Sequence, residues 1–398
     1  MLGINETAPC PYCYGRINST KLHFRCTGRP APGRDACKKK EDSFRRSVLQ
    51  DGTPVLPSFQ PAAKFALLSP TRAACPSCGG ETGTRVCPLC HSVLPANFTH
   101  KSPLFGIAGV RGSGKTVMLT VLNKELTTTV ARRFSANIDA VGSSNLLTRL
   151  DNTWKDIQKP GGRLPDQTAA RNTIDTVPAV FEWQLERSGV GGFTRTVSTI
   201  LSFYDTSGED LSTAERTREQ HYLGAADGLI LLLDPFGFPE NREHALSMGV
   251  DPESLKDLPR QVLHNLTDLL RETEHLRANK KIKRPLAVVL AKIDAFFRDL
   301  EEQDPIRQPS SREPHFDEAE SVNLHHHIES LVAQWGGSDV LSMLRLNYTT
   351  YRFFVASALG AEPDYGTGRV NSRGVLPHRV AEPLLWLMAQ RGFLETRW

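Results

Sequence analysis

The fold of this 398-residue chain is decided by the stretch Leu104-Phe-Gly-Ile-Ala-Gly-Val-Arg-Gly-Ser-Gly-Lys-Thr116. Its first half is a short apolar run of the kind that forms a buried strand. Its second half, Gly109–Thr116, matches the pattern GxxxxGK[ST] in full, and a helical pattern follows over Val117–Leu126. A strand, a glycine-rich turn and a helix in this order predict a loop that binds the phosphates of a nucleoside triphosphate.

The chemistry of the loop follows from its residue types. Its glycines let successive backbone N–H groups point toward one anion at the positive end of a helix dipole. We expect the Lys115 ammonium group to reach the β- and γ-phosphates and the Thr116 hydroxyl to ligate Mg²⁺. Arg111 is a candidate for stabilising transition-state charge, although an exposed arginine is the simpler interpretation. The predicted nucleotide contacts of the loop are Gly109, Gly112, Ser113, Gly114, Lys115, Thr116 and Val117.

Apolar runs of strand length continue along the chain, and they alternate with helical patterns. They lie at Val177–Leu185, Val197–Tyr204, Gly228–Leu233, Leu286–Leu290 and Arg352–Ala356. This alternation predicts an α/β fold, a largely parallel sheet covered by helices on both faces. Loops that bind phosphate should then line up at the carboxyl ends of the strands.

Three further motifs follow predicted strands. In Asp205-Thr-Ser-Gly208, we expect Asp205 to hold Mg²⁺ near Thr116 and the Gly208 N–H to contact the γ-phosphate. Ala291-Lys-Ile-Asp294 resembles the [NT]KxD element that reads guanine. In it the Asp294 carboxylate would accept two N–H donors of the base, and the Lys292 stem would pack over the ring. A salt bridge at the strand end is the alternative for these two residues. Ser357-Ala358 resembles the element whose backbone contacts guanine O6.

All eight cysteines lie before residue 91. Cys75-Pro-Ser-Cys78 and Cys87-Pro-Leu-Cys90 are CxxC pairs, and two such turns facing each other present the four thiolates that Zn²⁺ binds. Cys10-Pro-Tyr-Cys13 is a third pair, which leaves Cys26 and Cys37. Disulfides are disfavoured because the sequence shows no secretory signal. We expect two structural zinc sites, one at Cys10, Cys13, Cys26 and Cys37 and the other at Cys75, Cys78, Cys87 and Cys90.

The order GxxxxGKT, DxxG, KxD and Ser-Ala resembles the TRAFAC class of P-loop GTPases, which includes Ras-like proteins. The cysteine pairs in front, the phrase Phe203–Asp210 (FYDTSGED) and the ending Val380–Trp386 (VAEPLLW) are similar to bacterial double-GTPase proteins, proposed components of conflict or signalling systems. The resemblance covers about residues 103–395. It implies GTP or GDP with Mg²⁺ as ligands.

The resemblance also implies a Ras-like sheet with one antiparallel edge strand at Val177–Leu185. A switch threonine should precede that strand, and Thr168 is preferred over Thr173 and Thr176. Two departures from the family pattern stand out. Ala291 replaces the usual Asn or Thr, and Glu209 stands where many Ras-like proteins carry a water-orienting Gln. A carboxylate beside the γ-phosphate is repelled by it, so intrinsic hydrolysis should be slow.

Charge and hydropathy bound the remaining properties. The net charge is +4, yet residues 1–100 contain 13 Lys/Arg and 6 Asp/Glu, a balance of +7. The basic run Lys38-Lys39-Lys40 could meet nucleic acid or acidic lipid, but a solvated lysine-rich surface is favoured. No apolar run is long enough to predict a membrane span, and a cytoplasmic protein is expected. His325-His-His327 indicates a solvated helix face rather than a metal site, because adjacent helical residues point in different directions.

These observations predict four segments: a first four-cysteine zinc module at residues 1–45, a linker at 46–68, a second four-cysteine zinc ribbon at 69–99, and a P-loop GTPase-like domain at 100–398. The leading hypothesis is a GTP-binding regulatory switch with weak intrinsic hydrolysis, whose zinc modules dock a protein partner. One alternative is a P-loop ATPase that acts on nucleic acid. Another is a nucleotide-dependent scaffold that does not hydrolyse.

Overall fold

The structure is a computed structural model of the chain. It describes residues 7–18, 21–49, 51–62, 70–96, 98, 103–109, 112–142, 144–165, 178–188, 194–203, 221–256 and 258–398. The chain divides into two compact units, which we name by their main feature. The cysteine-rich unit comprises Met1–Leu104, Asp139–Ser144 and Asp175–Phe203, and the parallel-sheet unit comprises Phe105–Ile138, Asn145–Ile174 and Tyr204–Trp398.

The parallel-sheet unit is built on four strands, β8 (Phe105–Gly109), β12 (Gly228–Leu233), β13 (Leu286–Leu290) and β15 (Tyr351–Val355). Their order is β15-β13-β12-β8, and every neighbouring pair is parallel. All residues of β8, β12 and β13 are buried, as expected for strands covered on both faces. The sequence predicted the bounds of β12 and β13 to the residue.

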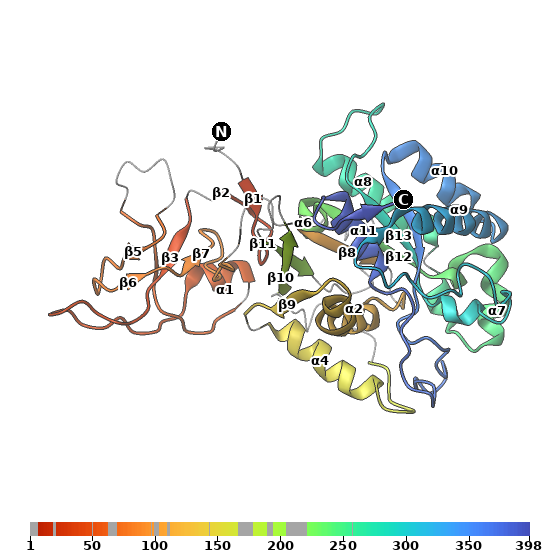
Figure 1. Cartoon of the computed structure of the whole chain (residues 1–398), viewed down its shortest axis with the longest axis horizontal. Coiled ribbons are helices and arrows are strands. Elements are labelled where there is room, and N and C mark those ends of the chain that lie inside the picture. Colours follow the sequence, from red (N-terminus) through yellow and green to blue (C-terminus); the bar gives the residue numbers. More distant parts are fainter. Residues whose placement is uncertain are drawn as a thin grey trace. The chain divides into compact units, whose positions relative to one another are not determined.

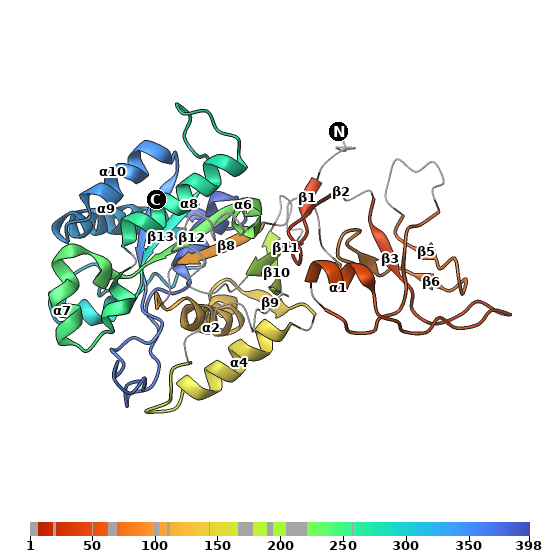
Figure 2. The ribbon, with the colours of Figure 1, turned by 180° about the vertical axis from the view of Figure 1, so that it is seen from behind.

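Helices flank this sheet. In Figure 1, α8 (Pro259–Thr273) and α10 (Ser338–Asn347) lie above the strands, and α2 (Lys115–Glu125) lies below them. Figure 2 shows the same arrangement from behind. Apolar residues at helical spacing, such as Val262, Leu266 and Leu270 in α8, are buried, which is why these segments form amphipathic helices. The α/β fold with a parallel sheet is therefore as predicted.

The other helices among the described residues of this unit are α3 (Ala131–Arg133), α4 (Asn145–Ile157), α6 (His221–Ala225), α7 (Arg242–Ser247), α9 (Glu318–Gln334) and α11 (Glu382–Gln390). Short helical turns lie at Leu126–Val130, Pro235–Gly237, Pro239–Asn241, Pro252–Leu255 and Ile293–Phe296, and β14 (Phe316–Asp317) pairs with β16 (Thr396–Arg397). α11 is buried along nearly its whole length and contacts β12 and β13.

In its described residues, the cysteine-rich unit contains short strands, one helix and one long hairpin. Its short elements are β1 (Thr7–Pro9), β2 (Arg16–Asn18), β3 (His23–Arg25), α1 (Ser43–Leu49), β4 (Ser58–Phe59), β5 (Ala73–Ala74), β6 (Glu81–Thr82) and β7 (Arg85–Val86). The hairpin pairs β10 (Ala179–Ser188) with β11 (Thr194–Phe203) over ten residues. β9 (Ala136–Ala140), of which Asp139 and Ala140 belong to this unit, lies next to β10 in the same three-stranded sheet.

The hairpin corrects one expectation. The antiparallel strand predicted at Val177–Leu185 exists as β10, but it does not form the edge of the parallel sheet. It belongs to a separate sheet in the order β11-β10-β9. The reason lies in its packing, since Val180 and Ile200 of the hairpin are buried in a core made by the cysteine-rich segments. Among the described residues, no helix is long and apolar enough to cross a membrane.

Leu231 tests the importance of the parallel sheet. It is fully buried in β12, between β13 and β8. Leu231→Ala should lower the free energy of unfolding by about 2–5 kcal/mol, because it removes buried methyl groups and leaves a cavity. Urea unfolding followed by circular dichroism measures the change. Leu346→Ala is the matched control, since Leu346 is 72% exposed and should cost within about 0.5 kcal/mol. Equal losses for both variants would contradict the assigned core.

Candidate nucleotide-binding and metal sites

The carboxyl ends of the four parallel strands bring the predicted nucleotide motifs to one edge of the sheet. The register aligns Gly109 of β8 with Leu232 of β12, and Leu233 with Leu290 of β13. Backbone bonds continue beyond the strands, where the Ala291 N–H donates to the Leu233 carbonyl at 3.0 Å. The glycine-rich loop, the KxD segment and Ser357 therefore start from the ends of strands of one sheet, as the sequence predicted.

The described part of the glycine-rich loop has the backbone that its motif requires. A side chain at Gly109 would lie 2.7 Å from Ser113 Oγ and 3.0 Å from Leu232 Cβ, so only glycine fits. Gly112 and Gly114 have positive φ angles of 77° and 86°. Helix α2 begins directly after Gly114, and no side chain caps its first turn. Its leading N–H groups thus form the kind of helix terminus that binds anions.

The KxD segment is also held in a defined conformation. Lys292 has a positive φ of 54°, and Asp294 is buried in the short helical turn that follows. Burial raises the pKa of Asp294, and a hydrogen bond from the fully buried Ser357 hydroxyl opposes that rise. Ser357 is fixed in turn, because its N–H donates to the His378 carbonyl at 3.0 Å. The two predicted base-reading elements are therefore linked to each other.

Asp234 is a residue of this site that the sequence analysis missed. It follows β12, and its Oδ2 lies 2.6 Å from the Lys292 ammonium nitrogen. Its other carboxylate oxygen accepts the Phe236 N–H, and Lys292 lies 5.9 Å from the Phe236 ring centre. The strand-end salt bridge considered for the KxD segment thus exists for Lys292, with Asp234 as partner. An acidic residue immediately after an apolar strand was the signal that could have found it.

The loop after Ser357 connects this edge to a more distant segment. The Val370 N–H donates to the Gly162 carbonyl at 2.7 Å, and the Leu164 N–H donates to the Gly368 carbonyl at 2.8 Å. Gly162–Leu164 precedes Thr168, the preferred switch threonine, by only a few residues. The loop that begins at the base-reading element therefore holds the chain just ahead of the predicted switch.

Several predicted site residues lie outside the described part of the chain. They are Arg111 in the glycine-rich loop, Thr168, Thr173 and Thr176 before β10, and Asp205, Gly208 and Glu209 after β11. Their roles stay predictions, as do the ligand roles of Ser113, Lys115, Thr116, Val117 and Ala358. Ser113 is buried two residues before α2, and Lys115 is buried at its first position.

The three CxxC turns share one backbone design. In each, the residue after the second cysteine has a positive φ: 60° at Tyr14, 71° at Gly79 and 53° at His91. The N–H of that residue donates to the carbonyl of the first cysteine, at 2.9 Å, 2.8 Å and 3.0 Å respectively. This turn places both sulfurs on one side of the loop, as a metal-binding knuckle requires.

The eight cysteines form two groups of four, but not the groups that the sequence suggested. One group is Cys10, Cys13, Cys87 and Cys90, and the other is Cys26, Cys37, Cys75 and Cys78. The expected grouping of neighbours in sequence, Cys10 to Cys37 and Cys75 to Cys90, is wrong. Each group instead takes two cysteines from either side of residues 38–74. The physical reason is antiparallel strand pairing. Cys26 follows β3 and Cys87 follows β7, and because the two strands run in opposite directions these cysteines lie at opposite ends of the pair, one in each tetrad.

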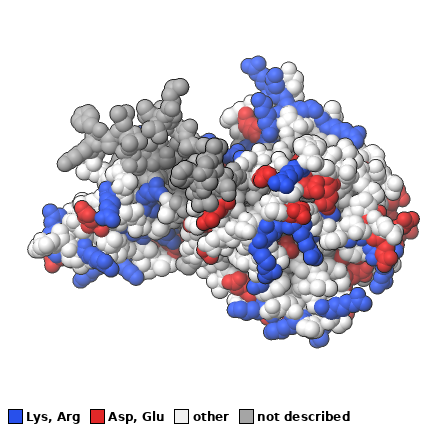
Figure 3. Space-filling view, viewed as in Figure 1, with Lys and Arg blue, Asp and Glu red and all other residues white. Residues whose placement is uncertain are grey.

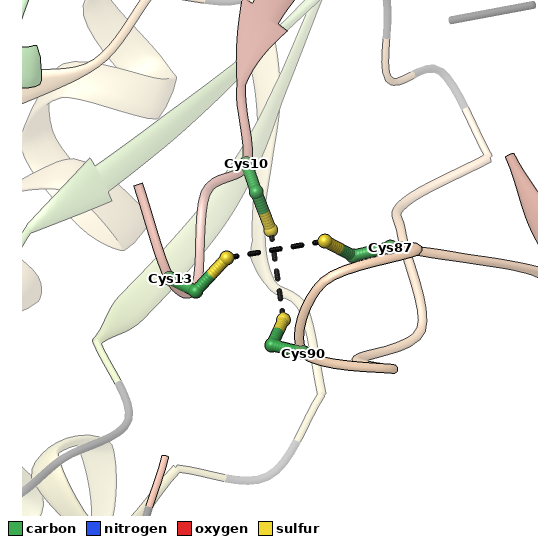
Figure 4. A group of neighbouring side chains, drawn as sticks. All are labelled: Cys10, Cys13, Cys87 and Cys90. Carbon is green, nitrogen blue, oxygen red and sulfur yellow. Dashed lines mark hydrogen bonds between the residues drawn. The ribbon is translucent and has the colours of Figure 1, made fainter. Parts of the chain in front are cut away.

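The spacing of the sulfurs fits a tetrahedral metal. Figure 4 shows the Cys10–Cys90 and Cys13–Cys87 contacts crossing each other, and both measure 3.9 Å. In the other group the corresponding distances are 3.5 Å for Cys26–Cys78 and 3.9 Å for Cys37–Cys75. Four sulfurs bound to one Zn²⁺ at about 2.3 Å are about 3.8 Å apart. The Gly80 N–H lowers the pKa of the Cys78 thiol to about 7, whereas burial raises the pKa of the Cys26 thiol in the same tetrad to about 12.

A third cluster contains His325, His326 and Glu329 on α9. His326 is exposed, whereas His325 is half-buried and packs against the Phe353 ring. The Nδ1 atom of His325 accepts the Phe353 N–H at 3.1 Å, and burial lowers the pKa of the ring to about 4. The neutral ring therefore carries its proton on Nε2, which leaves that nitrogen without a lone pair for a metal. The expectation of a fully solvated helix face is wrong for His325.

Comparison with known sequences decides the family. The profile of the Double-GTPase 2 family matches residues 104–338, more than half of the chain. The chain belongs to the Double-GTPase 2 family. The matched region contains the glycine-rich loop, the DxxG and KxD segments and all strands of the parallel sheet except β15. This Double-GTPase 2 protein is thus a P-loop GTP-binding protein, and its two cysteine tetrads precede the matched region in sequence.

A curated relative extends the similarity beyond the GTPase region. SaeC of Mycolicibacterium smegmatis, whose name assigns it to scaffolding and assembly of ESX-1, is 24% identical over 327 residues. The alignment covers 78% of this Double-GTPase 2 chain and 80% of SaeC.

Solved GTPase structures are more distant. The Arl6 BBS3 small GTPase of Trypanosoma brucei, solved with GppNp, is 13% identical, with a TM-score of 0.28, over 74% of this chain and 99% of that structure. The GTP-bound Ski7 GTPase-like domain of S. cerevisiae is 13% identical, with a TM-score of 0.31, over 76% of this chain and 53% of that structure. Overlap this low does not define the fold, which rests on the sheet order and the family match.

The interleaved tetrads lead to a clear prediction for metal content. Cys10→Ser combined with Cys90→Ser removes two ligands of one tetrad, so the protein should retain one metal ion per chain. Cys10→Ser combined with Cys26→Ser removes one ligand from each tetrad and should weaken both sites. Zinc content after dialysis against a weak chelator measures the difference. The opposite result, with both metals weakened by the first pair and only one by the second, would restore the grouping by sequence.

Proposed function

We propose that this protein is a GTP-dependent switch whose nucleotide state is passed to the cysteine-rich unit through the β10–β11 hairpin. Guanine nucleotide and Mg²⁺ would bind at the carboxyl edge of the parallel sheet, and a Zn²⁺ ion would occupy each tetrad. The observation that carries the proposal is the packing of the hairpin against the first tetrad.

The contacts of the hairpin with the Cys10–Cys13 knuckle are specific and buried. The Ser202 hydroxyl of β11 donates to the Pro11 carbonyl at 2.6 Å, inside the knuckle itself. Val180 and Ile200 share one apolar core with Cys10, Cys87 and Cys90. Packed cores and short buried hydrogen bonds move as a unit, so a displacement of the hairpin would displace the metal knuckle.

Both ends of the hairpin lead into predicted switch segments. β10 begins at Ala179, shortly after Thr168, and β11 ends at Phe203, two residues before Asp205. Segments that contact the γ-phosphate and Mg²⁺ are the usual places where triphosphate binding orders a GTPase. The strands of the hairpin are thus continuous in sequence with the segments that would contact the γ-phosphate, and a movement of these segments would be transmitted to the zinc module.

Slow intrinsic hydrolysis and protein docking complete the proposal. Glu209 at the position of the usual Gln supports weak catalysis, as argued above. The name of SaeC, which refers to scaffolding and assembly, supports a protein partner rather than a small-molecule substrate. Four thiolates per site leave no open coordination position, so the metals would be structural. The predicted boundary at residue 99 belongs to this proposal too, whereas those at residues 45 and 68 are dropped, because each tetrad joins cysteines from both sides of them. A nucleic-acid ATPase and a non-hydrolysing scaffold are the alternatives.

Asp294 tests the nucleotide choice. Asp294→Asn should weaken GTP binding by about 2–3 kcal/mol, because guanine loses a charged acceptor for two N–H donors. ATP binding should change little. Burial raises the pKa of Asp294, so this carboxylate becomes protonated at a higher pH than an ordinary aspartate does. As the pH is lowered, the GTP affinity of the wild type should therefore begin to fall at a higher pH, because protonation removes the acceptor. Fluorescent-nucleotide titrations with GTP and ATP competitors measure both effects.

Lys115→Ala is the companion variant. It should abolish triphosphate binding while the zinc content stays at its wild-type value, since Lys115 lies in the parallel-sheet unit. ATP outcompeting GTP in the wild type, together with salt-sensitive RNA binding, would favour the ATPase alternative and contradict the proposal.

Ser202 tests the coupling. Removing zinc from the wild type with a zinc-selective chelator should speed GDP release several-fold, because the hairpin loses its support. In Ser202→Ala, GDP should leave the zinc-loaded protein faster, and chelation should then have a smaller effect. Ser198→Ala is the control, since the Ser198 hydroxyl bonds to Glu182 within the same hairpin. Stopped-flow release of labelled GDP measures all rates. A wild-type GDP release rate that does not change on zinc removal would exclude coupling between the metal knuckle and the nucleotide site.

A further inference from the structure

Four large apolar side chains of the cysteine-rich unit are exposed around one of its metal knuckles. On α1, Phe44 is 50% exposed and Val48 is 47% exposed, one helical turn apart. On the Cys87–Cys90 turn and just after it, Leu89 is 42% and Val93 is 45% exposed. The Phe44 ring lies 4.5 Å from the ring of His91, which stands between Leu89 and Val93 in the chain. We name these four residues the α1 patch.

The α1 patch is held in place by a buried carboxylate. Asp42 accepts the N–H groups of Phe44 at 3.1 Å and Arg45 at 3.3 Å, and so caps the start of α1. The same carboxylate lies 2.9 Å from His91 Nδ1, on the turn that presents Cys87 and Cys90. The helix is therefore fixed to the metal knuckle, and Leu49 at its end is buried in the knuckle core. A preorganised apolar surface of this kind loses little entropy on binding.

The charges near the patch are unbalanced. Each acidic residue close to α1 is already engaged: Glu41 with Arg46 at 2.5 Å, Asp42 with His91, and Asp51 with Arg45. Lys38, Lys39 and Lys40, which directly precede these residues, are exposed, and no ion pair in the described part of the chain engages them. Figure 3 shows Lys and Arg side chains over the visible face of this unit, with few Asp and Glu between them. The segment that leads into α1 is thus positively charged.

We propose that the α1 patch docks a protein segment that carries large apolar side chains beside Asp and Glu residues. The apolar residues would cover Phe44, Val48, Leu89 and Val93, and the acidic residues would face Lys38–Lys40. Single-stranded nucleic acid fits less well, because three of the four patch residues are aliphatic and offer no ring on which bases stack. The inference rests on the proposed role of the cysteine-rich unit in docking a partner, and it names the chemistry of that partner.

Synthetic peptides test this proposal with the full-length, zinc-loaded protein. The probe is a labelled peptide with leucines at helical spacing (i, i+3, i+4, i+7) and glutamates beside them. The matched peptide has lysines in place of the glutamates. Fluorescence anisotropy should show binding of the acidic peptide at least about tenfold tighter than binding of the basic one, with the difference shrinking at high salt.

Variants locate the binding. Phe44→Ser with Val48→Ser should weaken the acidic peptide about tenfold or more, because two apolar anchors are lost. Lys38→Glu with Lys39→Glu and Lys40→Glu should weaken it and reverse its salt dependence. The control is Leu258→Ser with Leu346→Ser, which removes two exposed leucines of the parallel-sheet unit and should leave binding unchanged.

Three outcomes would overturn the proposal. They are equal binding of both peptides, binding that is unaffected by the Phe44 and Val48 changes, and a preference of the α1 patch for single-stranded RNA or for phosphatidylserine vesicles over the acidic peptide. GTP affinity, measured on the same samples, keeps the two proposals apart. A protein that binds GTP but no peptide loses only the docking surface, whereas one that binds the peptide but no GTP loses only the switch.

Discussion

The tetrahedral arrangement of four sulfurs is the interaction on which the cysteine-rich unit depends. Its described N-terminal strands are only two or three residues long, and such short strands do not hold a fold by themselves. A structural zinc site contributes about 10–16 kcal/mol of apparent binding free energy, enough to stabilise them. Because each tetrad joins cysteines from both ends of the unit's N-terminal segment, the segment folds as one body. The β10–β11 hairpin packs against this body through the Ser202 hydrogen bond and the core around Val180.

The parallel sheet imposes a different constraint, on the nucleotide. Parallel strands end at one edge, so a glycine turn after β8, Asp234 after β12 and Lys292 after β13 meet there without any long connection. The ion pair between Asp234 and Lys292 holds the lysine in place. Ala291 has no side-chain hydrogen-bonding group, and the Asp234–Lys292 pair joins the end of β13 to the end of β12 at this edge. The hairpin connects the two constraints along the chain, because its strands continue into the predicted switch segments.

Much of the sheet and of the nucleotide edge could be predicted from sequence, since continuous apolar runs such as Leu286–Leu290 form buried strands whatever surrounds them. The knuckle turns were also predictable, because CxxC spacing fixes a local geometry. Which knuckles share a metal site was not predictable from the sequence. A CxxC motif does not specify the motif that completes its site, and the pairing of His23 with Val86 is long-range. The predicted position of β10 at the edge of the parallel sheet was wrong for the same reason. Its sequence pattern fits a strand in either sheet, and its packing in the core around Cys10 decides between them. Asp234 was missed because a single acidic residue after a strand does not form a recognisable motif.

Hydrogen–deuterium exchange, compared between the GTP-analogue and GDP forms, tests most directly whether the hairpin and the metal knuckles act as one body. In the zinc-loaded protein, the account predicts that the change of nucleotide alters exchange in three places together: residues 179–203, the Cys10–Cys13 knuckle and the Cys87–Cys90 knuckle. After zinc removal, the hairpin should still respond to the nucleotide, whereas the two knuckles should not. Knuckles whose exchange is identical in both nucleotide states of the zinc-loaded protein, beside a hairpin that responds, would contradict it.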